Sequence, residues 1–239
     1  MMEIKFIICN DYDEMSHRAA EIFAAQIKEN PESVLGLATG STPVGMYSEL
    51  ASMGLDFSRI KSVNLDEYYP ISPKNENSYR YFMNENLFSK VNININNTYV
   101  PNGEAADAEK ECREYDALID RLGGIDLQVL GIGPNGHIGF NEPDTELFAG
   151  THVTSLTLST VEANSRFFSS VDEVPKKAIT MGMSSILSAK KIVLLISGKN
   201  KHAALKALLD DKITPAVPAT FLKLHRDVTV ICDKAAYEG

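Results

Sequence analysis

Residues 131–143, GIGPNGHIGFNEP, bring an amide, an imidazole and a carboxylate together among glycines and prolines. The first three glycines spell GxGxxG, the pattern of a dinucleotide-binding turn. That motif needs a helix directly after the glycines and an acidic residue about 20 positions further on. Pro134 interrupts the motif, and HIGFNEPD lacks helical apolar spacing, so we do not predict a nucleotide site here.

The glycines instead let the loop fold tightly, which would bring Asn135, His137 and Glu142 near one another. A neutral imidazole needs a neighbour that fixes its tautomer, and a carboxylate or an amide can do this. We therefore interpret the three residues as a proton-handling group. A zinc site is the weaker interpretation, because no second histidine stands at the spacing of helical zinc ligands, and we predict no metal.

A second chemical candidate is NLDEYYP, residues 64–70, where two carboxylates follow an apolar strand. A carboxylate at that depth is partly desolvated, which raises its pKa toward that of a useful general base. Asp66 lies closer to the strand end than Glu67, so we predict Asp66 as the base and give Glu67 no role. The alternative is a helix or turn cap, for which Asp is a favoured residue.

The stretch LATGSTPVG joins a predicted strand to a helix through small residues. Free backbone N–H groups and the positive end of a helix dipole make such a turn suitable for a phosphate. No GK[ST] follows, so this is not a Walker loop. The alternative is an ordinary helix start, capped by Ser41 or Thr42, with Pro43 in the first turn. The candidate phosphate-binding residues are Thr39, Gly40, Ser41 and Thr42.

Two cations are candidates for the same anion. Lys201, in SGKNKHAALKALL, lies at the start of a predicted helix and could reach a phosphate as a point charge. Arg166, in NSRFF, could supply a forked cation. Taken alone, Lys201 also fits an ordinary solvated lysine, and Arg166 also fits a structural salt bridge.

These residues must be positioned by the surrounding elements, and short apolar runs alternate with helical patterns along the chain. A helix with apolar residues from Met15 to Ile27 is closed by Pro31. We expect a polar loop at residues 92–101 and a side-layer strand at 152–158. The predicted main strands are residues 5–9, 34–38, 60–65, 125–130, 191–197 and 228–232.

This alternation predicts an α/β fold, a three-layer αβα arrangement with a mostly parallel, Rossmann-like sheet and helices on both faces. Ligands of such sheets bind at the carboxyl ends of the strands. The four chemical segments described above, which begin near Thr39, Asp66, Gly131 and Gly198, each follow a predicted strand. We therefore expect them to converge on one edge of the sheet.

Composition limits the function classes. The chain has 239 residues, 44% of them hydrophobic, which is enough for one domain spanning residues 1–239. A net charge of −9 argues against a nucleic-acid partner. Three scattered cysteines suit a reducing, cytoplasmic setting, and no apolar run is long enough to cross a membrane.

The motifs LATGSTP, NLDEYY, GIGPNGHIGFNEP, NSRFF and SGKNK occur in the order found in glucosamine-6-phosphate deaminases, also called isomerases. The chain resembles this family over essentially its whole length, and GHIGFNEP is the most specific piece. The resemblance implies conversion of D-glucosamine 6-phosphate and water to D-fructose 6-phosphate and ammonia.

The resemblance also implies a role for each candidate residue. His137 would open the sugar ring, with Glu142 and Asn135 orienting it, and Asp66 would move the C2 proton to C1. Residues 39–42, Arg166 and Lys201 would hold the phosphate. No metal or organic cofactor would be needed, because proton transfers along the substrate carry the chemistry.

One residue departs from the family pattern, and two other functions stay open. Many members have Asp at the position of Asn135, and an amide carries no charge, so ring opening would be tuned differently. A 6-phosphogluconolactonase would share the fold and the phosphate site but hydrolyse an ester. A sugar-phosphate sensor domain would share the fold without catalysis, and no basic helix-turn-helix pattern accompanies this chain.

Longer members of the family form hexamers that N-acetylglucosamine 6-phosphate activates from a site between subunits. That site uses basic residues after FNEP and a C-terminal extension. Here the corresponding stretch, GTHVTSLTLST, has His152 as its one potentially cationic residue, and the sequence ends at Gly239, shortly after the last predicted strand. We therefore expect a short, non-allosteric form that is a monomer or a small homo-oligomer.

Overall fold

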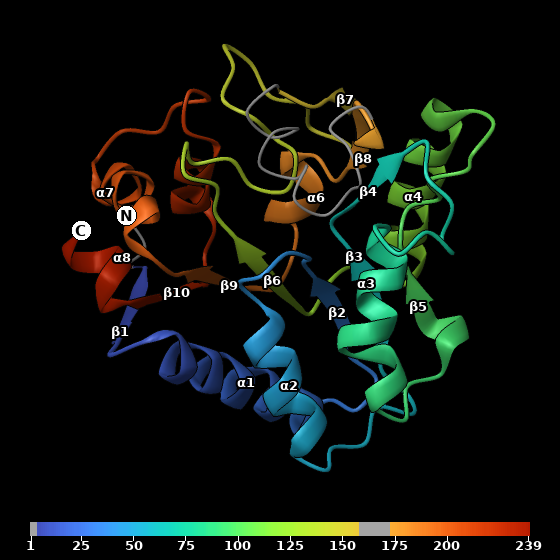
Figure 1. Cartoon of the computed structure of the whole chain (residues 1–239), viewed down its shortest axis with the longest axis horizontal. Helices are drawn as coiled ribbons and strands as arrows, with labels where there is room; N and C mark the ends of the chain where they lie inside the picture. The colour runs from blue at the N-terminus through green and yellow to red at the C-terminus, as the bar shows by residue number, and fades with distance from the viewer. Residues whose placement is uncertain (1–3, 158–172) are drawn as a thin grey trace.

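A seven-stranded sheet, parallel throughout, forms the centre of the molecule (Figure 1). The computed structural model describes residues 4–157 and 173–239. In spatial order the strands are β1 (Lys5–Cys9), β10 (Val228–Asp233), β9 (Lys191–Ile196), β6 (Leu127–Gly131), β2 (Val34–Leu37), β3 (Lys61–Asn64) and β5 (Thr98–Tyr99).

Strands β2 and β9 are nearly continuous apolar runs, as expected for strands whose two faces are covered by helices. Every residue of β2 is buried, as are the last five residues of β9. The predicted α/β class and the three-layer arrangement are confirmed. The main strands lie within two residues of their predicted bounds. The principal helices are α1 (Tyr12–Glu29), α2 (Val44–Ser52), α3 (Tyr79–Asn86), α4 (Ala108–Arg121), α6 (Met183–Leu187), α7 (His202–Leu209) and α8 (Lys234–Glu238).

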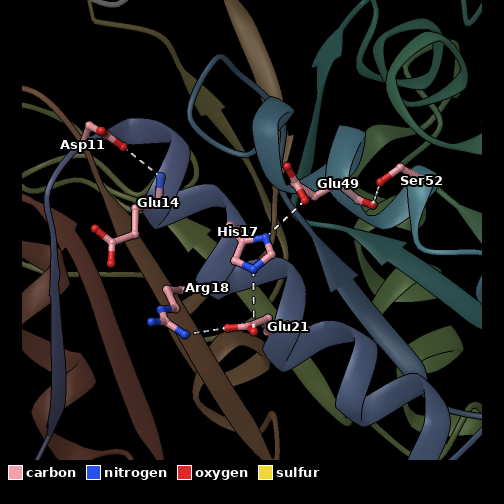
Figure 2. A network of polar contacts seen from close by, with 7 residues as sticks. All are labelled: Asp11, Glu14, His17, Arg18, Glu21, Glu49 and Ser52. Carbon is pink, nitrogen blue, oxygen red and sulfur yellow. Dashed lines mark hydrogen bonds and ion pairs between the residues drawn. The ribbon is translucent and has the colours of Figure 1, made fainter.

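Helices α1 and α2 pack against each other (Figure 1). A Cβ atom on Gly45 would lie 2.3 Å from the hydroxyl oxygen of Ser16, so the glycine permits this close approach. On the exposed side, His17 lies between the two helices, 3.2 Å from Glu49 and 3.6 Å from Glu21 (Figure 2). Such solvated ion pairs contribute little stability. The close contact between Gly45 and Ser16 therefore fixes the start of α2.

A second, antiparallel sheet continues from the carboxyl end of β3 (Figure 1). Its strands, in order, are β4 (Asp66–Tyr69), β8 (Lys177–Thr180) and β7 (His152–Ser155). The main-chain N–H of Met181 donates to the carbonyl of Leu65 at 2.8 Å, which joins the two sheets. The predicted side-layer strand is confirmed over residues 152–155. Strand β4 was not predicted, because DEYY lacks an apolar alternation.

The segment at residues 92–101 differs from the predicted polar loop. It contains a 3₁₀ turn, η2 (Ile95–Asn97), and the edge strand β5. Ser62 and Val63 of β3 pair with the two residues of β5, so tertiary pairing prevails over a polar local sequence. The other 3₁₀ segments are η1 (Phe88–Lys90), η5 (Lys199–Lys201) and η6 (Pro218–Leu224). Across the described residues, no helix combines the length and apolar character needed to span a membrane.

Candidate active site

The glycine-rich loop at residues 131–143 is a tight turn. The N–H of Gly133 donates to the carbonyl of His137, and the N–H of Gly136 to the carbonyl of Gly133, each at 2.9 Å. Gly136 has a φ of 86°, which glycine adopts without strain. No helix begins after the glycines, which confirms that GxGxxG is not a dinucleotide motif here.

Asn135, His137 and Glu142 come together as predicted. The Asn135 amide donates to Glu142 Oε2 at 2.8 Å, and the Asn135 carbonyl oxygen accepts the His137 backbone N–H at 3.2 Å. The same Glu142 oxygen lies 3.3 Å from His137 Nδ1. That contact is at ion-pair distance, but His137 Nδ1 lacks a well-aligned hydrogen bond. Such contacts are often loose without substrate and tighten when it binds.

The His137 ring lies directly against the backbone of Gly133. A Cβ atom at Gly133 would lie between 2.3 and 2.5 Å from three atoms of that ring. No side chain fits in that space, so glycine at position 133 allows the imidazole to pack against the backbone. The His137 side chain is 25% exposed, so part of it remains accessible to a substrate.

Asp66 is the first residue of β4 and is only 6% exposed. The glycine-rich loop passes over it, because a Cβ atom on Gly139 would lie 3.3 Å from Asp66 Oδ2. Two hydrogen bonds hold the loop there. Phe140 N–H donates to the Thr180 hydroxyl at 3.1 Å, and the Asn141 amide donates to the Met181 carbonyl at 2.8 Å.

Burial, and after it the negative charge of Glu67, raises the pKa of the Asp66 carboxyl to about 8. Burial also raises the pKa of Glu67 to about 7, while three backbone N–H groups and Arg80 oppose that rise. A carboxyl group whose pKa lies near the operating pH is suited to general acid–base catalysis. Asp66 therefore has the environment that a general base requires.

The turn at residues 39–42 follows β2 and leads into α2. Gly40 has a φ of 93°, and among the described residues no acceptor is found for the N–H groups of Gly40, Ser41 and Thr42. The Tyr12 hydroxyl shapes this turn, since it donates to the Ser41 carbonyl at 3.0 Å and accepts the Gly45 N–H at 2.8 Å.

The predicted helix cap at this turn is wrong. Pro43 occupies the N-cap position of α2, and no side chain there accepts a hydrogen bond from the helix. The turn therefore keeps backbone donors available at the positive end of a helix, where an anion is stabilised.

Lys201 ends the 3₁₀ turn that follows β9, and it is half-buried. Burial lowers the pKa of its ammonium group. Among the described residues no carboxylate lies within ion-pair distance of it, so its charge is available to a bound anion. Asp233 holds the turn in place by accepting the Ser197 hydroxyl at 2.5 Å and the Gly198 N–H at 3.1 Å. Arg166 lies outside the described residues.

Strand order brings these segments together. β9, β6, β2 and β3 are successive neighbours in the sheet, and each is followed by one of the four predicted segments. The expected convergence at the carboxyl edge is therefore confirmed for the segments near Gly198, Gly131, Thr39 and Asp66. In the described part of the chain, no group of three or more His, Cys, Asp or Glu side chains is arranged to hold a metal ion.

Several residues that build this site were not identified from the sequence. Tyr12, Thr180 and Asp233 act through contacts with distant segments, and no local pattern marks such contacts. Glu67 was noticed but given no role.

Residues 10–231 match the model of a family described as glucosamine-6-phosphate isomerases/6-phosphogluconolactonase. The chain belongs to this family. Within it, a glucosamine-6-phosphate deaminase of Clostridium perfringens is 56% identical over 98% of both chains. A glucosamine-6-phosphate deaminase of Clostridioides difficile is also 56% identical, over 98% of this chain and 95% of its own length.

Solved structures of family members agree with this assignment. A monomeric glucosamine-6-phosphate deaminase superposes with a TM-score of 0.96 at 49% identity, covering 98% of this chain and 99% of its own. The 6-phosphogluconolactonase of Thermotoga maritima gives a TM-score of 0.76 at 22% identity, covering 97% and 100% of the two chains. At that identity the likeness to the lactonase concerns the fold alone.

Proposed function

We propose that the chain is a glucosamine-6-phosphate deaminase, which converts D-glucosamine 6-phosphate and water into D-fructose 6-phosphate and ammonia. The full-length relatives at 56% identity support this reaction. The single structural observation that carries it is that a buried carboxylate with a raised pKa, Asp66, lies beneath the loop that bears His137.

The first step opens the pyranose ring. His137 accepts the proton of the anomeric hydroxyl and returns a proton to the ring oxygen as the C1–O5 bond breaks, leaving an aldehyde at C1. Glu142 Oε2, 3.3 Å from Nδ1, keeps the imidazole oriented. The Asn135 side-chain NH₂ donates a hydrogen bond to that carboxylate, and its side-chain oxygen accepts the backbone N–H of His137, which stabilises the loop.

The second step moves the double bond. Asp66 removes the C2 proton, and the electrons form an enolamine whose C1 oxygen takes a proton from the substrate's own ammonium group. The same carboxyl group returns the C2 proton to C1, which becomes CH₂OH, while C2 becomes an iminium carbon. Water adds to C2, its protons pass to the nitrogen and to solvent, the C–N bond breaks, and ammonia leaves a ketone at C2. The proton transfers need only groups on this chain, the substrate and water.

The phosphate would bind at the free backbone N–H groups of residues 39–42 and at Lys201, with Arg166 as a second cation. Three observations support this part of the proposal. The turn offers donors without acceptors, α2 points its positive end at it, and Lys201 carries a partly desolvated charge. The expected partner is therefore a small sugar phosphate.

A lactonase is the main competing function, and one experiment separates the two. Purified protein would be given D-glucosamine 6-phosphate, unphosphorylated D-glucosamine, and 6-phosphogluconolactone in parallel. We expect equal amounts of fructose 6-phosphate and ammonia from the first, far slower turnover of the second, and no hydrolysis of the third above its spontaneous rate. Ester hydrolysis without ammonia release would establish the lactonase function instead, and activity on neither would leave the sensor function.

The proposal also covers the oligomeric state, the partners and the cellular location of the protein. A 49% identical neighbour is a monomeric deaminase, which supports a monomer in preference to a larger assembly. The net charge of −9 supports a protein that does not bind nucleic acid. Three buried, free cysteines support a cytoplasmic setting.

A further inference from the structure

Glu67, which the proposed chemistry does not use, is a buried carboxylate whose two oxygens are both hydrogen-bonded. It is 2% exposed. Its Oε1 accepts the N–H of Tyr68 at 2.9 Å and that of Tyr79 at 2.8 Å, and its Oε2 accepts the N–H of Arg80 at 2.9 Å. Because both oxygens are held by backbone groups, the carboxylate has one fixed position.

Two of these donors lie in the first turn of α3, so Glu67 joins that helix to the strand that begins with Asp66. The Arg80 guanidinium extends the connection to the main sheet. It donates to the hydroxyl of Thr98 at 2.7 Å and to the Thr98 carbonyl at 2.8 Å. Glu67 and Arg80 also line a 240 Å³ cavity.

The hydrogen bonds explain why residue 67 is a carboxylate, and they also fix a charge there. Ser78 already accepts the Tyr81 N–H at 3.0 Å as the N-cap residue. The N–H groups of Tyr68, Tyr79 and Arg80 need both carboxylate oxygens, because an amide would turn its own NH₂ group toward one of these donors. The same carboxylate places a fixed negative charge on the residue next to Asp66.

We propose that Glu67 is a positioning residue for the deamination, which fixes the backbone of Asp66 against α3 and keeps a second negative charge beside that base. The inference rests on the proposed role of Asp66. A neighbouring negative charge disfavours ionisation of Asp66 and so makes its carboxylate a stronger base toward the C2 proton. Once the proton has moved to Asp66, the repulsion between the two carboxylates is relieved.

Other ionisable groups around the pair do not supply this charge. Burial raises the pKa of Tyr79 and of Tyr115 well above the ordinary tyrosine value, so both phenols stay neutral while the carboxylates titrate. The remaining ionisable groups on elements packed around the pair are Tyr47 on α2, Tyr68 on β4, Arg80 on α3, His152 on β7, Lys177 on β8, and His137 and Glu142 in the loop above.

The test compares Glu67→Gln with Glu67→Asp. The amide keeps the size of the side chain and removes its charge, whereas the aspartate keeps the charge. We expect the acid limb of the kcat/KM profile to move to lower pH by about one unit in Glu67→Gln and to stay near the wild-type position in Glu67→Asp. A limb that stays in place in Glu67→Gln, with turnover lowered equally at every pH, would assign Glu67 a purely structural role.

A second measurement covers the case in which Glu67→Gln does not fold. The inference requires Glu67 to carry its charge before Asp66 ionises, as the raised pKa values of about 7 and about 8 indicate. In ligand-free wild type, the ¹³C chemical shifts of the two carboxyls are therefore expected to show Glu67 ionising at lower pH than Asp66. An Asp66 carboxyl that ionises before Glu67 overturns the inference, because Glu67 would then be neutral beside the base.

Different results would overturn the proposed function and the role of Glu67. If wild-type protein releases no ammonia from glucosamine 6-phosphate, the proposed function falls whatever Glu67 does. If ammonia is released but the acid limb stays in place in Glu67→Gln, or Asp66 ionises before Glu67 in wild type, the role of Glu67 alone falls.

Discussion

At the scale of single residues, the proposed chemistry depends on two groups in contrasting environments. Asp66 is buried beside another carboxylate, whereas the His137 side chain is partly exposed. A buried carboxyl holds its proton to higher pH, and a partly exposed imidazole can exchange protons with a substrate oxygen. The sequence placed both groups correctly at strand ends, but it could not reveal that Glu67 would be buried as well, because that depends on α3 packing against β4.

The pKa of Asp66 has a direct consequence for its titration. Since that pKa is raised to about 8, the free enzyme holds Asp66 protonated below this value and ionised above it, so its basicity is lost as the pH falls through about 8. Infrared difference spectra of wild type against Asp66→Asn should show a protonated carboxyl band that disappears around pH 8. A band that is already absent at pH 6 would contradict the assignment.

His137 should affect ring opening and leave the later steps alone. Ring opening also proceeds spontaneously in water, so we expect His137→Gln to retain a larger residual rate than Asp66→Asn. The variant should bind the acyclic amino-alditol 6-phosphate about as well as wild type, because that analogue has no ring to open. Isothermal titration calorimetry measures this affinity, and a large loss would mean that His137 holds the substrate.

At the scale of elements, the site is an edge of a sheet on which four loops converge. The strands, their parallel order and the positions of the loops followed from apolar periodicity and from the preference of ligands for carboxyl ends. The second sheet was only partly foreseen, because β4 and β8 each have four residues and are fixed by pairing with each other. The absence of a side-chain cap on α2 was also missed, since Ser41 and Thr42 have the residue types of caps.

Two glycines of one loop give a matched test of how the loop supports His137. Alanine at Gly133 would place a Cβ atom 2.3 Å from the imidazole ring, whereas alanine at Gly131 would meet nothing within 4 Å. We expect Gly133→Ala to lower kcat by at least about tenfold, because a displaced catalytic group loses its alignment. Gly131→Ala should stay within about twofold of wild type.

Steady-state kinetics and thermal unfolding of both variants check this expectation. Equal activity in the two would show that the position of the imidazole does not depend on Gly133. Equal loss in the two, accompanied by lower melting temperatures, would instead indicate a general destabilisation of the loop.

At the scale of the whole molecule, one chain supplies the sheet edge, the base, the histidine loop and the candidate phosphate turn. The stretch after FNEP offers His152 as its one potential cation, and burial lowers the pKa of that imidazole. A second anion would therefore find little positive charge there. Without an effector that binds two states differently, a sigmoidal response has no source.

We accordingly expect hyperbolic substrate kinetics, no activation by N-acetylglucosamine 6-phosphate, and the mass of a monomer. Substrate titrations with and without the acetylated sugar phosphate, run alongside light scattering, check all three. A sigmoidal curve that the effector makes hyperbolic, together with a larger assembly, would show that another surface has taken over the regulatory role.

The central claim is that Asp66 removes the proton from C2, and isotope release tests it most directly. Substrate deuterated at C2 would be incubated with wild type and with Asp66→Asn, and both loss of C2 deuterium and release of ammonia would be followed. We predict that the variant loses about 10²–10⁴-fold in both rates while its KM changes little, because a positioned base contributes that much. A variant that removes the C2 deuterium and releases ammonia at wild-type rates would contradict the account.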